Sequence, residues 1–281
     1  MIIVNLSGGL GNQMFQYACG KSLACRKKTK LVLDHRFLET PEYPVTPRKY
    51  ELSSFNIKTA LFDEIDLSLL PEEVKLVTET RHLKYDPAVI EKINKNTYLN
   101  GYWQSWKYFC DIESIIRKRF CPVSQQVVAK EYLHLAGVLR QRQSVSIHVR
   151  RTDYTYPVYA FISALPLTYY LNAIKYILQN ISNPVFYIFS DDPDWVEAHL
   201  KPSGETHIIR NNTIAGDLFL MSCCRHHIIA NSTFSWWGTW LNDSPDKLVI
   251  APKTWFIGTN WRTENLDIIP PGWITIEING Q

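Results

Sequence analysis

Two adjacent arginines, Arg150 and Arg151, follow a short apolar segment in the sequence SIHVRRTDY. A guanidinium group can hold a phosphate through two parallel hydrogen bonds, and ligands of parallel sheets bind beyond the carboxyl ends of the strands. His148 stands two residues before Arg150, so both side chains point to the same side of an extended strand. Adjacent residues of a strand point to opposite sides, so the pattern indicates that one arginine reaches a phosphate-bearing ligand and the other supports the structure. A surface ion-pair cluster with Asp153 and a core role for His148 are the alternatives.

A polar cluster occurs in the segment NSTFS, between an apolar strand and an apolar helix. The first N–H groups of a helix lack internal partners and lie at the positive end of its dipole, which suits phosphates. Hydroxyl groups can add further donors. Plain N-capping of the helix is the alternative. The candidate ligand-binding residues of this cluster are Asn231, Ser232, Thr233, Phe234 and Ser235.

Aspartates stand at two further candidate positions. Asp191 and Asp192 follow the predicted strand Val185–Phe189. Asp192-Pro-Asp194 has the spacing that holds a metal in many sugar transferases, but either Asp191 or Asp192 also fits as the cap of the helix that follows, and we expect no metal. Asp217 lies near the start of another predicted helix. It fits either as a cap or as the acceptor of two hydrogen bonds from a guanine edge, since carboxylates only accept.

The N-terminal segment contains a glycine turn, Gly8 to Gly11, between a predicted strand and a predicted helix. It is similar to a dinucleotide-binding loop. Met14, however, occupies the position of the third glycine, where the helix packs on the sheet, which argues against a nicotinamide cofactor. Asn12 and Gln13 place amide groups at the helix start, where they could bind ligand hydroxyls. A purely structural turn is the alternative.

These candidates need strands and helices to bring them together. A strand–helix–strand unit opens the chain, and strands and helices alternate from residue 145, which is typical of parallel sheets. We predict an α/β fold of two Rossmann-like lobes facing a cleft, at residues 1–135 and 136–281, with a C-terminal tail that packs back on the first lobe. The predicted strands are Ile2–Leu6, Leu31–Leu33, Val145–Val149, Val185–Phe189, His207–Ile209, His227–Ala230 and Leu248–Ala251. The predicted helices are Asn12–Lys28, Pro166–Asn180, Pro193–Leu200, Ala215–Cys224 and Thr233–Asn242.

Two segments carry further expectations. The region of residues 40–135 is less regular, and its segment Tyr98 to Tyr108, YLNGYWQSWKY, gathers aromatic residues that could cover a core or cradle a sugar. The helix Pro166–Asn180 is predicted to bury one apolar stripe. That stripe consists of Leu167, Tyr170, Leu171, Ile174, Ile177 and Leu178.

Composition narrows the class of protein. A net charge of +3, from 30 basic and 27 acidic residues, is no nucleic-acid footprint. Six cysteines without a Cys-x-x-Cys pair suggest reduced thiols rather than a zinc knuckle. No signal peptide and no apolar run of membrane-spanning length is visible, so we expect no transmembrane segment and a cytoplasmic protein.

Four motifs together resemble the alpha-1,2-fucosyltransferase family, which includes bacterial O-antigen enzymes and the animal H blood-group transferases. They are GGLGNQMFQYA at 8–18, HVRRTDY at 148–154, FSDDPDW at 189–195 and IIANSTFSWWGTWL at 228–241. The resemblance implies a two-lobed glycosyltransferase B-type fold and an inverting, metal-independent transfer. GDP-fucose would be the donor substrate, the 2-hydroxyl of a galactose residue would be the acceptor, and no cofactor would be needed.

The resemblance also distributes roles among the candidates. Arg150 would hold the donor phosphates and Arg151 would mainly support it. We take Asp153, beside the arginines, as a hypothetical general base, so the catalytic candidates are Arg150 and Asp153. The donor-side candidates are His148 and Asp217 at the guanosine end, Asn231 to Ser235 at the pyrophosphate, and Asp191 and Asp192. The first-lobe candidates are Gly9, Asn12 and Gln13 for fucose and acceptor, with Tyr102 to Trp106 as a further acceptor candidate.

Other interpretations stay open. A fucosyltransferase of other linkage fits the same motifs, and aromatic content alone would also suit a non-catalytic sugar-binding protein. GDP binding separates the last interpretation from the others. The expected partners are GDP-fucose and a galactose-terminated glycan, with peripheral association at the inner membrane if that glycan is lipid-linked, and no nucleic acid.

Overall fold

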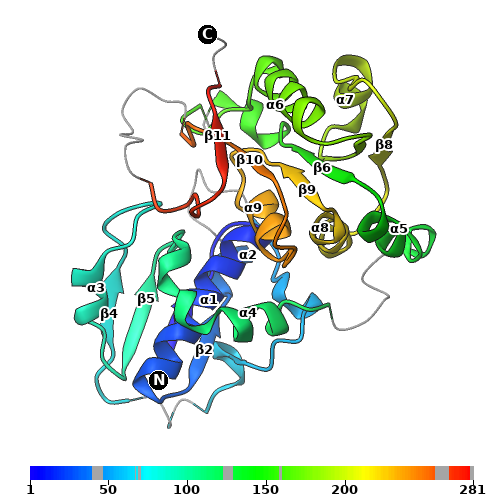
Figure 1. The fold of residues 1–281 in the computed structure, drawn as a ribbon. Helices are drawn as coiled ribbons and strands as arrows, with labels where there is room; N and C mark the ends of the chain where they lie inside the picture. The colour runs from blue at the N-terminus through cyan, green and yellow to red at the C-terminus, as the bar shows by residue number, and fades with distance from the viewer. Residues whose placement is uncertain are drawn as a thin grey trace. The chain divides into compact units, whose positions relative to one another are not determined.

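The computed structural model describes residues 1–39, 47–66, 68, 71–122, 129–157, 160–256 and 266–278. The chain divides into two compact units (Figure 1). Unit 1 comprises Met1–Val123 and Asn265–Pro270, and unit 2 comprises Ser124–Glu264 and Pro271–Gln281. The predicted boundary at 135/136 falls in unit 2, at the start of helix α5 (Leu135–Gln141).

Unit 1 is built on a five-stranded sheet in the order β3-β2-β1-β5-β4, with every pair parallel. Three of its strands, β3, β4 and β5, fall in the region of residues 40–135 that the sequence left irregular. One of these, β4, exposes three of its four residues, so it carries no apolar run that a sequence pattern could detect. The strands are β1 (Ile2–Asn5), β2 (Leu31–Asp34), β3 (Ala60–Leu61), β4 (Lys75–Thr78) and β5 (Thr97–Asn100). The helices are α1 (Leu10–Lys27), α2 (Arg36–Glu39), α3 (Pro87–Glu91) and α4 (Glu113–Arg119).

Helix α1 packs unusually close to strand β1. A Cβ atom placed on Gly20 would lie 2.4 Å from Cγ2 of Val4 and 2.9 Å from Cδ1 of Leu31. Gly20 therefore lets the helix approach the sheet, which is the task of the third glycine in a dinucleotide-binding loop. The close approach is made two turns further along the helix than in that loop, so the N-terminal turn need not have a glycine at Met14.

Unit 2 is built on a six-stranded sheet in the order β11-β10-β9-β6-β7-β8, with every pair parallel. The strands are β6 (Ser144–Val149), β7 (Val185–Ser190), β8 (Thr206–Ile209), β9 (His226–Ile228), β10 (Val249–Pro252) and β11 (Ile274–Ile276). The helices besides α5 are α6 (Leu167–Asn180), α7 (Pro193–His199), α8 (Ile214–Cys223) and α9 (Thr233–Trp240). Each predicted element of this region from Val145 onward is present, within two residues at either end.

The sheet of unit 2 is covered on both faces. Phe186 and Ile188 of β7 pack in one core cluster with residues of α6 and α7, while Val185 and Tyr187 pack in a second cluster with residues of α5 and α8. Side chains of successive strand residues point to opposite faces, so a strand covered on both sides reads as a continuous apolar run. This arrangement is the doubly wound architecture that the sequence predicts (Figure 1).

The predicted apolar stripe of α6 is partly wrong. Leu171 and Leu178 are 45% and 41% exposed, whereas Tyr169, Tyr170 and Ala173 are buried. Positions two apart on a helix lie about 200° apart, so Leu171 and Tyr169 cannot both face the sheet. The two tyrosines bury more surface than the leucine and set the rotation of the helix.

Candidate functional site

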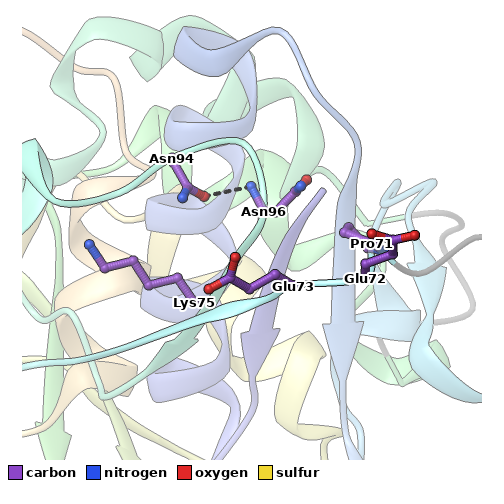
Figure 2. Close-up of a pocket in the computed structure, with 6 residues that line it drawn as sticks. All are labelled: Pro71, Glu72, Glu73, Lys75, Asn94 and Asn96. Atoms are coloured by element: carbon purple, nitrogen blue, oxygen red, sulfur yellow. Dashed lines mark hydrogen bonds between the residues drawn. The ribbon is translucent and has the colours of Figure 1, made fainter.

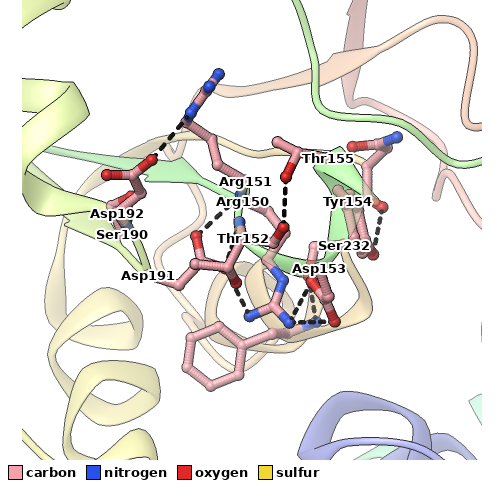
Figure 3. A network of polar contacts seen from close by, with 12 residues as sticks. Arg150, Arg151, Thr152, Asp153, Tyr154, Thr155, Ser190, Asp191, Asp192 and Ser232 are labelled. Carbon is pink, nitrogen blue, oxygen red and sulfur yellow. Dashed lines mark hydrogen bonds and ion pairs between the residues drawn. The ribbon is translucent and has the colours of Figure 1, made fainter. Parts of the chain in front are cut away.

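The carboxyl ends of β6 and β7 bring one arginine between two carboxylates. Nη2 of Arg150 lies 2.7 Å from Oδ2 of Asp153, and its Nη1 lies 3.2 Å from Oδ2 of Asp191 (Figure 3). The register explains this meeting, since Val149 of β6 pairs with Ser190 of β7 and the next residues follow side by side. Burial lowers the proton affinity of the guanidinium, but the two carboxylates outweigh it and raise the pKa of Arg150. A permanently charged donor group, 25% exposed, therefore lies at the strand end.

Asp191 also shapes the turn after β6. Its Oδ1 accepts a hydrogen bond of 2.9 Å from the backbone N–H of Arg151, and its Oδ2 accepts one of 3.2 Å from that of Thr152. The hydroxyl of Thr152 donates to the same carboxylate. Asp191 thus fixes the backbone that carries Arg150, a contact within the chain rather than a cap of α7. Thr152 was not among the sequence candidates, although its place between the arginines and Asp153 could have suggested it.

The side chain of Arg151 has different partners from that of Arg150. Nε of Arg151 lies 3.3 Å from Oδ2 of Asp192, and its guanidinium lies 4.0 Å from the ring centroid of Trp195 on α7. Asp192 caps that helix, because its Oδ1 accepts a hydrogen bond from the backbone N–H of Trp195. Both side chains therefore have partners within α7 and its cap, which fits the supporting role predicted for Arg151 and the capping alternative for Asp192.

His148 is a buried residue with unused hydrogen-bonding capacity. Its ring centroid lies 5.4 Å from that of Phe234, at the start of α9. Desolvation and the neighbouring Arg150 lower the pKa of His148 to about 3, and the charge of Asp191 opposes them only partly. Within the described ranges no group forms a hydrogen bond with its buried Nδ1. The imidazole next to Arg150 is therefore neutral, with a ring nitrogen that the described residues leave without a hydrogen bond.

The start of α9 is capped from within. Oγ of Ser232 accepts a hydrogen bond of 3.3 Å from the backbone N–H of Phe234, so the capping alternative holds for Ser232. Ser235 is fully buried, and its hydroxyl donates to the carbonyl of Ser232 at 3.1 Å. The hydroxyl of Ser235 is thus used inside the helix, and its predicted contact with a ligand stays a prediction. Thr233 and Phe234 are partly exposed at this end.

Asn231 holds two other segments to the start of α9. Its buried amide nitrogen donates to the carbonyls of Ile162, Ser163 and Trp255. Its backbone carbonyl accepts from the hydroxyl of Tyr154 at 3.4 Å. These contacts use the amide nitrogen, whereas the buried Oδ1 of Asn231 forms no hydrogen bond with a described residue, and its predicted contact with the donor stays a prediction. No local pattern could indicate the bracing role, because the partners lie far from Asn231 along the chain.

The carboxyl group of Asp217 on helix α8 has a shifted pKa. Burial raises the pKa of Asp217 to about 6, and a hydrogen bond of 2.9 Å from the amide of Asn212 opposes that shift. The helix is capped by Thr213, whose Oγ1 accepts from the N–H of Gly216. The capping alternative for Asp217 is therefore wrong, because Thr213 caps the helix and the carboxylate of Asp217 accepts from a side chain. Asn212, which orients it, was missed by the sequence patterns.

The first-unit candidates differ in what their side chains do. Gln13 is fully buried, and its amide donates to the carbonyls of Gly8 at 3.0 Å and Lys49 at 2.8 Å. Both N–H groups of its amide are thus used by backbone carbonyls, and its predicted contact with a ligand stays a prediction. Asn12 accepts a hydrogen bond of 2.8 Å from Gln104. A Cβ on Gly9 would meet no atom within 4 Å, so its backbone is open to a ligand.

The aromatic segment after β5 is mostly core. Trp103 is fully buried with a φ of 54°, in the left-handed region. The carboxylate of Glu79 accepts hydrogen bonds from the N–H groups of Tyr102 at 2.9 Å and of Trp103 at 3.0 Å, and so holds this backbone. Tyr102 and Trp106 are partly exposed and stay acceptor candidates.

A pocket lies apart from the carboxyl ends of the strands. A pocket of about 650 Å³, lined by Pro71, Glu72, Glu73, Lys75, Asn94 and Asn96, sits at the amino ends of β4 and β5 (Figure 2). Ligands of parallel sheets bind at the opposite edge, so we place the candidate site at Arg150 instead. In the described parts of the chain, no three metal-binding side chains gather, and no helix is long and apolar enough to cross a membrane.

The architecture places the chain in a known class. Two α/β units, each built on a parallel sheet, are typical of B-type glycosyltransferases, and two solved structures share this fold. POFUT1 in complex with GDP-fucose matches with a TM-score of 0.55 at 13% identity, covering 89% of this chain and 97% of that one. NodZ alpha-1,6-fucosyltransferase soaked with GDP-fucose matches with a TM-score of 0.52 at 12% identity, covering 85% and 92%. The predicted fold class is confirmed.

Sequence similarity identifies the family. Residues 1–277 match glycosyl transferase family 11, and the chain belongs to that family. An alpha-1,2-colitosyltransferase of Escherichia coli is 32% identical, with 99% of both chains covered. The O-antigen biosynthesis glycosyltransferase WbnK of the same organism is 32% identical over 96% of this chain and 99% of its own. A galactoside 2-alpha-L-fucosyltransferase of Caenorhabditis elegans is 26% identical over 84% of this chain and 68% of its own. The resemblance to the alpha-1,2-fucosyltransferase family is confirmed.

Proposed function

We propose that the protein transfers L-fucose from GDP-fucose to the 2-hydroxyl of a galactose residue, forming an alpha-1,2 linkage in an O-antigen or another surface polysaccharide. The observation that carries the proposal is Arg150, charged and partly exposed at the end of β6, beside the unpartnered Nδ1 of His148. Support for the linkage comes from the names of the relatives, of which two specify alpha-1,2 or 2-alpha transfer.

The chemistry requires a stabilised leaving group. The donor carries a beta-linked fucosyl group, and attack by the acceptor hydroxyl from the opposite face gives an alpha product and releases GDP. Negative charge develops on the diphosphate as the glycosidic bond breaks. Arg150 and the N–H groups at the start of α9 are the groups that would receive this charge, and removing one such contact often costs about 100- to 1000-fold in rate. No metal or cofactor takes part in this scheme.

Asp153 is paired with Arg150, which limits how it could act as a general base. Its carboxylate lies 2.7 Å from Arg150, so in the absence of ligand it orients the guanidinium. A donor phosphate that binds Arg150 would compete for this contact and release the carboxylate to accept the proton of the acceptor hydroxyl. Asp153→Asn tests this step. Loss of kcat with unchanged GDP affinity supports the base, and unchanged turnover removes Asp153 from that role.

The experiment is a transfer assay with GDP-fucose and lactose or N-acetyllactosamine, in the presence of EDTA, with the product linkage read by NMR. The proposal expects an alpha-1,2 product from the wild type and a loss of about 100- to 1000-fold in Arg150→Ala. Arg142→Ala is the matched control. Arg142 precedes the amino end of β6, away from the candidate site, and it pairs with Glu205. No product with any galactose-terminated acceptor would reject the proposal.

A second donor deserves the same assay. The relative at 32% identity is named for colitose rather than fucose. Nucleotide-linked colitose should therefore be offered in parallel with GDP-fucose. A preference for colitose would keep the reaction class and correct the donor.

A further inference from the structure

Tyr154 closes the motif HVRRTDY and has no part in the proposed transfer. It lies in the short 3-10 turn Asp153–Thr155, directly after the two arginines. The backbone N–H of Thr155 donates to the carbonyl of Arg151 at 3.0 Å, so this turn is closed against the end of β6. Tyr154 is thereby held next to the candidate site, and its partly buried side chain contacts that site through both its ring and its hydroxyl.

The ring of Tyr154 lies beside the guanidinium of Arg150. Cζ of the arginine lies 5.5 Å from the ring centroid, within reach of a cation–π interaction. The carboxylates of Asp153 and Asp191 bind other parts of the same guanidinium. Because the ring meets Arg150 with its π face, it restrains the arginine without using an N–H group that a phosphate needs.

The hydroxyl at the end of this side chain contacts the start of α9. It donates to the backbone carbonyl of Asn231 at 3.4 Å and also forms a hydrogen bond with the side chain of Ser232. Burial raises the pKa of Tyr154 to about 12, although the charge of Arg150 and the bond to Ser232 oppose the shift, so the hydroxyl is protonated at neutral pH and able to donate. Ser232 is the cap of α9. One side chain therefore joins Arg150 to the residue at which α9 begins.

We propose that Tyr154 is a positioning residue that fixes the separation between Arg150 and the first turn of α9, so that both bind the donor diphosphate together. This inference rests on the proposed function, in which these two groups receive the charge of the leaving diphosphate. Two such groups act together only if their spacing is set before the ligand binds, since a displaced donor group no longer meets the developing charge. Tyr154 supplies a rigid connection of this kind, because its aromatic ring has few rotatable bonds.

The test compares a ligand that carries two phosphates with a ligand that carries one. Tyr154→Phe keeps the ring beside Arg150 and removes the link to α9. It should weaken GDP binding about fivefold, the value of one hydrogen bond, as measured by calorimetry. The affinity for GMP, measured by competition, should stay within about twofold, because a single phosphate does not span both groups. Tyr156→Phe removes the same hydroxyl from an exposed tyrosine two positions further on and should change neither affinity.

Transfer gives a second readout of the same role. The kcat of Tyr154→Phe should fall about tenfold while the acceptor KM is unchanged, because misalignment acts on the leaving group. Tyr154→Leu also removes the ring from Arg150 and should weaken GDP binding by about twofold to fivefold more than Tyr154→Phe does. Thermal unfolding would check that both variants are folded.

The outcomes separate the positioning role from the proposed reaction. If Tyr154→Phe loses GDP affinity but keeps GMP affinity while the wild type transfers no fucose, the positioning role stands and the proposed reaction fails. If the wild type transfers fucose and Tyr154→Phe keeps both its GDP affinity and its kcat, the positioning role is overturned. Equal losses of affinity for GDP and GMP would also overturn it, in favour of a tyrosine that only stabilises the local fold.

Discussion

Arg150 and Asp191 lie at the ends of neighbouring strands, with Nη1 of the arginine 3.2 Å from Oδ2 of the aspartate. The same carboxylate accepts hydrogen bonds from two backbone N–H groups of the turn after β6. One aspartate therefore fixes both the charge and the backbone of the residue proposed to meet the phosphates. These contacts make Asp191 a positioning residue for Arg150.

Asp191→Asn should lower kcat/KM about 100-fold, because a displaced guanidinium no longer meets the leaving group where charge develops. An asparagine keeps one acceptor oxygen but loses the charge that faces Arg150. The fold should persist, which circular dichroism would check. Asp194→Asn is the control, since that side chain is 89% exposed and pairs with Arg210 on the surface. Equal activity of both variants would mean that Arg150 needs no such support.

Asp217 should make GDP binding depend on pH. Burial raises the pKa of its carboxyl to about 6, so the charged form prevails above that value and is lost as the pH falls through it. If the carboxylate accepts from the guanine edge, the affinity for GDP is constant near pH 8 and declines below about pH 6. Calorimetric titrations from pH 8 to pH 5 would measure this decline.

The guanine contact itself can be isolated with inosine diphosphate, which lacks the exocyclic amino group of guanine. The wild type should prefer GDP over inosine diphosphate by about tenfold, the value of one hydrogen bond to a charged group. Asp217→Asn should lose most of this preference. A preference that survives the substitution would show that another group reads the base.

Acid should destabilise unit 2 through its buried histidines. His227 is fully buried, with Nδ1 at 2.8 Å from Oγ of Ser146 and Nε2 at 3.0 Å from the amide nitrogen of Asn242. The amide nitrogen donates, so Nε2 must accept and the ring must be neutral. Burial, with the charge of Lys247, lowers the pKa of His227 well below its ordinary value, as burial does for His148.

The sign of the effect follows from proton uptake. An unfolded histidine has a pKa of about 6.5, so below that pH the unfolded chain binds a proton that the folded chain refuses. The free energy of unfolding should therefore be constant above pH 7 and fall below pH 6.5 by about 1.4 kcal/mol per pH unit for each such histidine. Urea unfolding at pH 7.5, 6.5 and 5.5 would measure it. His134→Gln, at an exposed position, should leave the slope unchanged.

Replacing two helix glycines by alanine should change the stability of the protein in opposite directions. Gly20→Ala puts a methyl group 2.4 Å from Val4 and should destabilise unit 1 by about 1–3 kcal/mol. A Cβ on Gly137 in α5 meets no atom within 4 Å, so Gly137→Ala should stabilise its helix by about 0.5–1 kcal/mol. Thermal unfolding followed by circular dichroism would compare them. A neutral Gly20→Ala would show that α1 can move away from the sheet at little cost.

The sequence predicted unit 2 more completely than unit 1, for a physical reason. Its strands are covered on both faces and read as apolar runs, and its helices begin with clear signals such as Asp192 before Pro193. In unit 1, strand β4 exposes most of its side chains, so nothing distinguishes it from a loop. Periodicity also could not set the rotation of α6, which depends on how Tyr169 and Tyr170 fit the sheet.

At the candidate site, the sequence predicted which residues lie there better than it predicted their hydrogen-bond partners. The sequence pointed to Arg150 and His148, which the strand end presents as expected. It could not show that the amide of Gln13 would be used by backbone carbonyls, because its partner Lys49 lies 36 positions away. Nor could it show that Asn231 would bind the connection after β6. Such contacts depend on tertiary structure, so a local sequence pattern does not predict them.

The tryptophans are distributed unevenly between the two units. Of nine in the chain, only Trp103 and Trp106 belong to unit 1. Helix α9 alone carries Trp236, Trp237 and Trp240, whose rings contact one another. Intrinsic fluorescence will therefore report mainly on unit 2, and a shift of its emission maximum will follow the loosening of the helix whose first turn is proposed to meet the donor. Melting of unit 1 alone would pass almost unseen by this optical signal.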